Sequence, residues 1–131
     1  MTSMRDALLG GVPGRACNSE GMIHVLDELR VLPGHLADVR RLVHETYEPA
    51  LILLGMTRER TWIAPAVELL DEPTDLLLLW SVEDTPAFWR ARLGAMTDTR
   101  VADFWGTVAP MLESRNRRIM IDPDDRAAAL Q

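Results

Sequence analysis

The sequence predicts one α+β domain whose elements follow the order β-α-β-β-α-β, with a four-stranded antiparallel sheet and helices on one face. Apolar segments with strand patterning occur at 22–31, 56–66, 74–83 and 116–121. An amphipathic helical pattern lies between the first two, and a second helical pattern, broken in two, lies between the last two. The 131 residues suit a single domain with one core.

The strand predictions depend on alternation and on apolar runs. In 22–31, every second residue from Ile23 to Val31 is apolar except Asp27, which indicates a strand with one packed face. The run Leu76–Trp80 is continuously apolar and is typical of a central strand buried on both faces. In the second strand, strict alternation predicts that one face carries Met56, Arg58, Arg60, Trp62 and Ala64.

The helix predictions depend on spacing, caps and breakers. The pattern at 35–54 ends before Gly55, which suits a left-handed cap, and contains Pro49, which should kink the helix. Thr85 followed by a proline predicts a helix start, and that helix should stop near Gly94. A second start follows at Thr97 or Asp98.

Composition excludes several classes of function. The net charge of -6 opposes nonspecific binding to nucleic acid or to anionic membranes. No lysine occurs, so Schiff-base chemistry on lysine is excluded, and the single Cys17 permits neither an intramolecular disulfide nor a cysteine-rich zinc site. Without a convincing signal peptide or a transmembrane-length apolar stretch, we expect a cytoplasmic protein by default.

The domain itself should cover 22–121. We expect 1–21 to be a flexible N-terminal extension and 122–131 to be an acidic C-terminal tail. A sheet with helices on one face leaves its other face bare, and burial of that face against a second copy predicts a symmetric homodimer.

Three segments carry a resemblance to a known family: LRVLPG (Leu29–Gly34), YEPALILLGM (Tyr47–Met56) and LLLLWSVEDTPAFW (Leu76–Trp89). In their layout and helix boundaries they resemble the dimeric α/β-barrel superfamily, especially its NIPSNAP-like and antibiotic-biosynthesis-monooxygenase-like branches. The resemblance covers 22–121. It implies a ferredoxin-like fold, two sheets that close into a barrel between subunits, and a small-molecule cavity between sheet and helices.

The superfamily includes cofactor-free monooxygenases, polyketide cyclases, lactone isomerases and haem-handling enzymes, so the fold leaves the activity open. Haem-degrading members resemble this chain at Trp80, but they also place a histidine in the following helix. Residues 85–112 contain no histidine. We therefore expect no haem, a prediction that a missing Soret band after haem addition would support.

The candidate catalytic residues are His24, His44 and Tyr47. On a cavity wall, His24 could act as a general base, although its apolar neighbours favour a packed structural histidine. His44 lies about one turn before Tyr47, and the two could form an acid/base pair; the alternative is a surface histidine paired with Glu48. A metal site from His24, Asp27 and His44 is conceivable, but no HxH or HExxH spacing supports it, so we expect no metal.

The candidate substrate-binding residues are Trp62, Trp80 and Arg60. Tryptophan suits the wall of an aromatic-ligand cavity, although at least two of the four tryptophans should be plain core. Arginines border the predicted strands and could clamp a carboxylate or phosphate, or simply form surface ion pairs. They are Arg58, Arg60, Arg115, Arg117 and Arg118.

Two functions follow from these residues. The first is a cofactor-independent enzyme in which histidine-mediated proton transfer drives cyclisation, isomerisation or monooxygenation of a hydrophobic, polyketide-like aromatic substrate. The alternative is a non-catalytic small-molecule-binding or assembly protein of the same fold.

Overall fold

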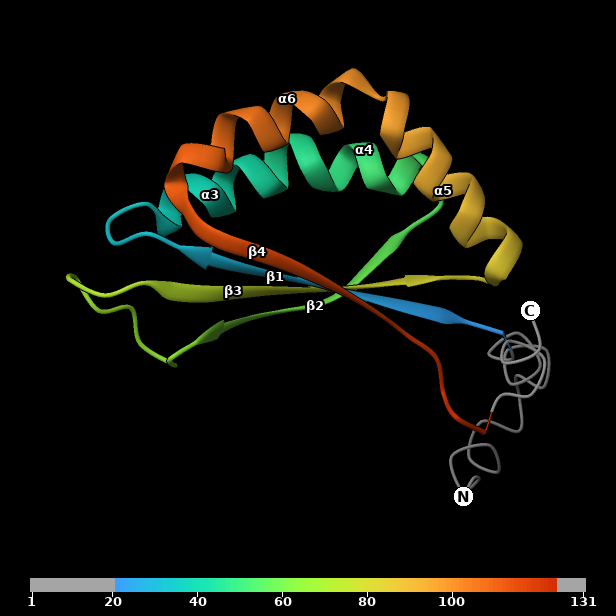
Figure 1. Ribbon diagram of the computed structural model, residues 1–131, viewed down its shortest axis with the longest axis horizontal. Helices are drawn as coiled ribbons and strands as arrows, with labels where there is room; N and C mark the ends of the chain where they lie inside the picture. The colour runs from blue at the N-terminus through green and yellow to red at the C-terminus, as the bar shows by residue number, and fades with distance from the viewer. Residues whose placement is uncertain (1–20, 125–131) are drawn as a thin grey trace.

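Four antiparallel strands form one sheet, and helices cover one of its faces (Figure 1). The computed structural model describes residues 21–124. The strands are β1 (Ile23–Val31), β2 (Thr57–Ala64), β3 (Thr74–Val82) and β4 (Leu112–Met120), in the spatial order β2-β3-β1-β4. All three strand pairs are antiparallel, so the predicted ferredoxin-like α+β fold is confirmed.

Two helical stretches connect the strands on the same side of the sheet. The first consists of α3 (Leu36–Leu42), a π-helical turn η1 (Val43–Tyr47) and α4 (Glu48–Leu53). The second is broken in two as predicted, into α5 (Thr85–Thr97) and α6 (Thr99–Val108), and ends in the 3₁₀ turn η2 (Ala109–Met111). Figure 1 shows α6 running alongside the first stretch, while α5 descends toward the end of the sheet.

Pro49 changes the hydrogen bonding of the first helix. Proline has no N–H, so the carbonyl of Glu45 loses its usual donor four residues ahead. In the turn just before it, the N–H of Glu48 donates instead to the carbonyl of Val43, five residues back. Tyr47 ends this π-helical turn and is buried. The helix thus widens just before Pro49, a feature frequent at functional sites, and the predicted kink stays a prediction.

The end of α4 is a Schellman motif. Gly55 has φ +100°, its N–H donates to the carbonyl of Ile52, and the N–H of Met56 donates to that of Leu51, both at 3.0 Å. The left-handed cap predicted at Gly55 is therefore confirmed. The motif folds Met56 back onto Leu51, and both side chains join the core.

Helix α5 begins at Thr85 as predicted, but its cap, its end and the start of β4 differ from the prediction. The cap of α5 is Asp84, whose carboxylate accepts from the N–H of Ala87 at 2.8 Å. The helix continues through Gly94, where an added Cβ would lie 2.6 Å from a methyl of Leu54; the glycine allows close packing rather than ending the helix. Pairing with β1 extends β4 back to Leu112.

The predicted single face of β2 is also wrong. A β-bulge shifts the register: Arg58 pairs with Trp80, whereas Arg60 pairs with Leu79, so Glu59 is the extra residue. One extra residue reverses which side of the sheet the following side chains face. Arg58 thus lies on the helix side, where it forms an ion pair with Glu48 at 3.0 Å.

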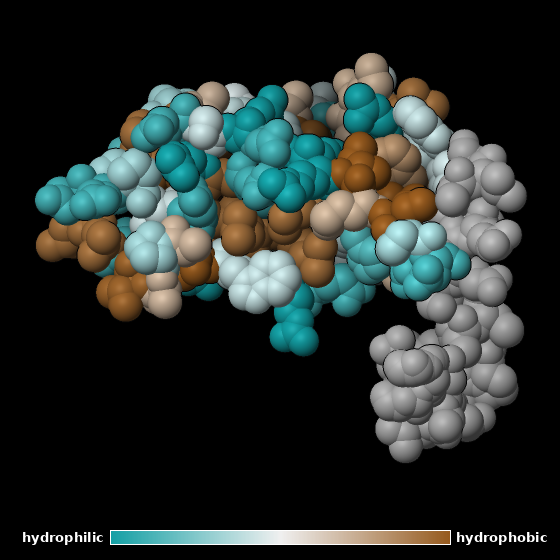
Figure 2. Space-filling view, turned by 60° about the horizontal axis from the view of Figure 1, so that its bottom comes forward, coloured by the Kyte–Doolittle hydropathy of each residue, from teal (hydrophilic) through white to brown (hydrophobic). Residues whose placement is uncertain are grey.

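The sheet has one buried and one open face. The core lies between the sheet and the helices and includes Val25, Leu29, Leu76, Leu78 and Phe104. Figure 2 shows apolar residues gathered in the middle of the sheet face that no helix covers. Alternation assigns to this open face the partly exposed Leu26, Leu77, Leu79 and Met120, together with Trp62.

The predictions for the two ends of the chain remain predictions. Residues 1–20, which include Cys17, and 125–131 lie outside the described residues. Within 21–124, no helix is long and apolar enough to cross a membrane.

Candidate functional site

A buried carboxylate lies at the centre of the helix-covered face. Asp27, on β1, is only 2% exposed. Its Oδ2 accepts from the Tyr47 hydroxyl at 2.9 Å, from Trp80 Nε1 at 3.1 Å and from Arg117 Nη2 at 3.2 Å. Its Oδ1 accepts from Arg117 Nε at 2.8 Å. Four donors from η1, β3 and β4 therefore converge on one side chain.

The carboxylate of Asp27 can accept few further hydrogen bonds. An ionised carboxylate offers about two acceptor positions on each oxygen, and here Oδ2 accepts three hydrogen bonds and Oδ1 accepts one. The paired bonds from Arg117 compensate the buried negative charge, which would otherwise be costly. The carboxylate of Asp27 thus holds Tyr47, Trp80 and Arg117 in place.

Tyr47 is the second member of this network. Besides donating to Asp27, its hydroxyl accepts from Arg117 Nη2 at 2.8 Å. Burial, reinforced by the charge of Asp27, raises the pKa of Tyr47 well above its ordinary value, although the cations Arg117 and Arg115 oppose the rise. The phenol is therefore a neutral hydrogen-bond donor at physiological pH. Its ring stacks on Phe104, with centroids 4.4 Å apart.

Arg117 stays charged despite partial burial. Burial lowers its pKa, but the hydrogen bonds and charge of Asp27, with a smaller contribution from Tyr47, more than offset this, and the net shift is upward. Its side chain is 34% exposed. Its Nη1 group makes no hydrogen bond to any residue within 21–124, which leaves two donors for a ligand.

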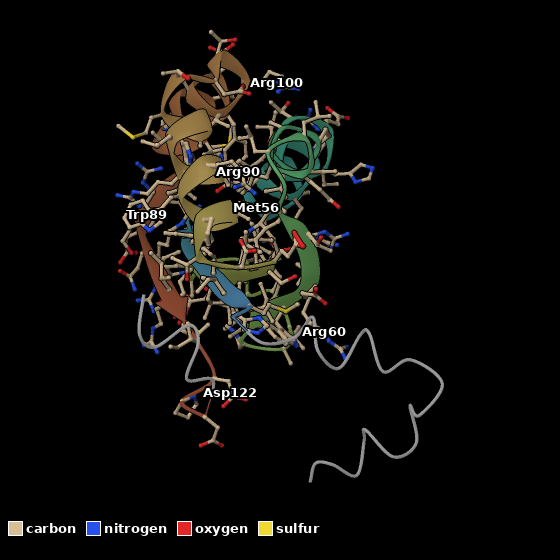
Figure 3. All side chains as sticks on the ribbon, turned by 90° about the vertical axis from the view of Figure 1, so that its right-hand side faces the viewer. Met56, Arg60, Trp89, Arg90, Arg100 and Asp122 are labelled. Carbon is tan, nitrogen blue, oxygen red and sulfur yellow. The ribbon has the colours of Figure 1, made fainter. Side chains whose placement is uncertain are left out.

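A cavity of about 370 Å³ adjoins the network, between the sheet and α5 and α6. Figure 3 looks onto α5 and shows Met56 between α5 and α4, whereas Trp89 lies on the β4 side of α5. Most of the wall is apolar; four of its polar residues lie on β1 and β4, and Tyr47 and Arg92 come from η1 and α5. The lining comprises Asp27, Leu29, Tyr47, Leu51, Met56, Phe88, Ala91, Arg92, Ala95, Val101, Trp105, Arg115, Asn116 and Arg117.

Two further arginines reach this cavity. Arg115 projects from β4, and its guanidinium carbon lies 4.0 Å from the centre of the Trp105 ring, a cation–π contact. Arg92 projects from α5 on the opposite wall. Within the described part of the chain, neither forms an ion pair.

The three candidate catalytic residues lie in three different places. Tyr47 lines the cavity, but His24 does not; it pairs with Ser81 and Met120 in the register and alternates with the buried residues of β1. His44 is 82% exposed and lies 4.0 Å from Glu48, in a separate surface hollow of about 400 Å³. The structure therefore does not bring the histidines to Tyr47 within one subunit.

The candidate substrate-binding residues also lie apart. Trp80 is fully buried and donates to Asp27, but it is not part of the cavity lining. Trp62 and Arg60 lie on the open face of β2, away from the cavity. Among the residues 21–124, no group of three or more His, Cys, Asp or Glu side chains is arranged to hold a metal, so His24, Asp27 and His44 do not form one.

Sequence reasoning did not assign the residues that define the cavity's polar end. The available signal was Asp27, the one charged residue on the buried side of the first strand. Arg115 and Arg117 were considered only as general clamps, because the strand was expected to begin after Arg115. Trp105 carried no signal beyond helical spacing, since its contact with Arg115 depends on how α6 crosses β4.

Several solved structures share the fold of this chain. A NIPSNAP family protein from Agrobacterium tumefaciens matches with a TM-score of 0.64 and 19% identity, over 80% of this chain and 89% of that chain. A NIPSNAP-like domain protein from Burkholderia xenovorans matches with a TM-score of 0.64 and 15% identity, over 80% and 88%. A Nitrosomonas europaea protein provisionally assigned as an antibiotic biosynthesis monooxygenase matches with a TM-score of 0.59 and 14% identity, over 80% of this chain and 93% of that chain.

The chain is thus an α+β protein of ferredoxin-like fold with a cavity between its sheet and its helices. Its fold is the one shared by NIPSNAP family proteins and antibiotic-biosynthesis-monooxygenase-like proteins, as the resemblance implied. No protein-family model matches the sequence, and neither does any curated protein. At these levels of identity the likeness extends to the fold alone.

Proposed function

We propose that this protein binds a hydrophobic small molecule in the cavity beside Asp27 and Tyr47. The observation that carries the proposal is the cavity itself, whose volume of about 370 Å³ lies within the range of small-molecule sites. Its wall combines an apolar majority with a few polar groups, as such sites do. The hydrogen bonds of Asp27 hold the polar end in one geometry before any ligand arrives.

Filling the cavity tests this proposal. Ala95, on α5, lines the cavity, so Ala95→Phe should occupy part of the space. Its neighbour Met96 is 74% exposed and outside the lining, and Met96→Phe is the matched control. The probes are 2-naphthoate and 2-naphthamide, measured by calorimetry.

Binding of at least one probe should be lost in Ala95→Phe and kept in Met96→Phe. Equal binding by both variants, or no binding of either probe to the unmodified protein, would contradict the cavity proposal. Circular dichroism of both variants establishes that each remains folded.

A catalytic role for this site is the second candidate. In it, His24 or His44 acts with Tyr47 to transfer a proton, without a cofactor, in cyclisation, isomerisation or monooxygenation of an aromatic, polyketide-like substrate. What favours it is that Tyr47 lines the cavity, and that the Nitrosomonas europaea protein of the same fold carries a monooxygenase assignment. This candidate stands second because His24 lies on the open sheet face and His44 lies in the separate surface hollow, so neither contacts Tyr47 within one subunit.

Histidine substitution tests the catalytic candidate. If it is right, the double variant His24→Ala, His44→Ala loses turnover of a polycyclic aromatic substrate while it keeps its fold and its ligand affinity. His35→Ala is the control, since the His35 side chain makes no capping hydrogen bond at the start of α3 and lines neither hollow. Unchanged turnover in the double variant would leave binding as the function.

A further inference from the structure

We infer that the ligand of this cavity is an organic anion, whose carboxylate or phosphate group is bound by Arg115 and Arg92 while its apolar body packs against the helices. This inference rests on the proposed function and names the chemical class of the ligand.

The charges of the cavity wall are the first argument. The lining contains three arginines and one acidic residue. Asp27 is committed to Arg117, so the positive charges of Arg92 and Arg115 are uncompensated there. The whole chain has 20 acidic and only 14 basic residues, so two unpaired cations in its cavity run against its overall balance. Such a wall favours a negatively charged ligand.

The orientation of Arg115 is the second argument. The ring of Trp105 supports the flat face of the guanidinium, which leaves the N–H edge available. That edge matches the two oxygens of a carboxylate or phosphate. Stacking also restricts the side chain before binding, so less conformational freedom is lost when an anion arrives.

The convergence of the cations is the third argument. Arg115 and Arg117 are two residues apart on β4 and pair with Leu29 and Asp27, so they share the helix-covered side of the sheet. Arg92 approaches from α5. The anion would therefore lie between the sheet and α5, with Arg115 on one side and Arg92 on the other.

The apolar part of the wall fixes where the rest of the ligand lies. Phe88, Ala91 and Ala95 occupy the cavity-facing side of α5, and Leu51 on α4 and Met56 just before β2 lie toward the sheet edge opposite β4. A flat apolar body of two fused rings would be covered here while its anionic group reaches β4.

The test compares two probes of the same shape, 2-naphthoate and its neutral counterpart 2-naphthamide. The protein should bind the naphthoate at least about tenfold more tightly, since hydrogen bonds to charged groups are the stronger kind. Arg115→Gln and Arg92→Gln should each reduce this preference, and the double variant should abolish it. Arg118→Gln is the matched control: it removes the same charge from β4, but Arg118 pairs with Glu28 and does not line the cavity.

The outcomes separate this inference from the proposed function. Equal affinities for the two probes, both lost in Ala95→Phe, would overturn the anion assignment while the cavity proposal stands. A preference that survives the double arginine variant, or that falls equally in Arg118→Gln, would also overturn it. Binding of neither probe would overturn both proposals. A third probe, 2-naphthyl phosphate, distinguishes the two anions: tighter binding than the naphthoate assigns a phosphate, and weaker binding a carboxylate.

Discussion

Removal of the Tyr47 hydroxyl is the sharpest test of the buried network. In Tyr47→Phe the ring and its stacking on Phe104 remain, but two hydrogen bonds disappear, one to Asp27 at 2.9 Å and one from Arg117 at 2.8 Å. Both partners are charged, and the hydroxyl belongs to a residue that is 1% exposed.

The size of the stability loss depends on the hydrogen bonds that remain in Tyr47→Phe. Asp27 keeps three donors and Arg117 keeps both bonds to Asp27, so the charge pair itself survives. A hydrogen bond to a charged group contributes about 1.5–3 kcal/mol, and with the network otherwise intact we expect a loss of about 2 kcal/mol in the free energy of unfolding. For a folded region of this size that corresponds to a fall in Tm of roughly 10 °C.

Urea denaturation followed by circular dichroism measures this loss. The control is Thr61→Val, which also removes a hydroxyl that accepts from an arginine, Arg58 at 2.8 Å, but in an exposed setting. It should change stability by less than about 0.5 kcal/mol. If Tyr47→Phe were no more destabilised than Thr61→Val, the Asp27 network would not be the stabilising element described above.

Three further predictions follow from the fold. The pKa of Tyr47 in the folded protein is raised above its unfolded value of about 10. The contribution of Tyr47 to stability should therefore be complete below about pH 10 and be lost as the pH rises beyond it. Because the chain has a single tyrosine, phenolate absorbance should appear at higher pH in the native protein than in urea. Asp84→Ala should cost about 1 kcal/mol by uncapping α5, measured by thermal denaturation, and an unchanged Tm would contradict the cap. Trp62→Arg should convert a homodimer into a folded monomer in sedimentation, since Trp62 is 45% exposed on the open face; a monomeric unmodified protein would refute that dimer.

Local sequence signals determined most of the elements. Alternation from Ile23 to Val31, the apolar run of β3 and the glycine after α4 all act within a few residues, so their consequences can be worked out without tertiary contacts. The break between α5 and α6 belongs to the same class, because Asp98 caps the second helix through its own neighbours, with its carboxylate accepting from the N–H groups of Arg100 and Val101.

Features set by contacts between distant residues could not be predicted in this way. Gly94 ends a helix by propensity, yet the approach of Leu54 explains why a glycine stands inside α5. The bulge at Glu59 reverses the faces of β2, and it exists only in the pairing with β3.

The candidate site likewise has residues that the sequence could indicate and residues that it could not. Of the three residues predicted to be catalytic, Tyr47 alone lines the cavity, and its catalytic role stays a prediction; its hydrogen-bond partners Asp27 and Arg117 were not predicted. Histidines were favoured because their ordinary pKa suits proton transfer, a property of the residue type that carries no information about position.

The sequence by itself thus determined the order of elements, the α+β class and the composition that excludes lysine chemistry, since these depend on local patterns and residue counts. The tertiary structure alone decided that Asp27, Tyr47, Trp80 and Arg117 meet. They come from β1, η1, β3 and β4, up to 90 residues apart in the chain. Strand register and the π-helical turn bring them together, because each is settled by packing across the sheet rather than by neighbours in sequence.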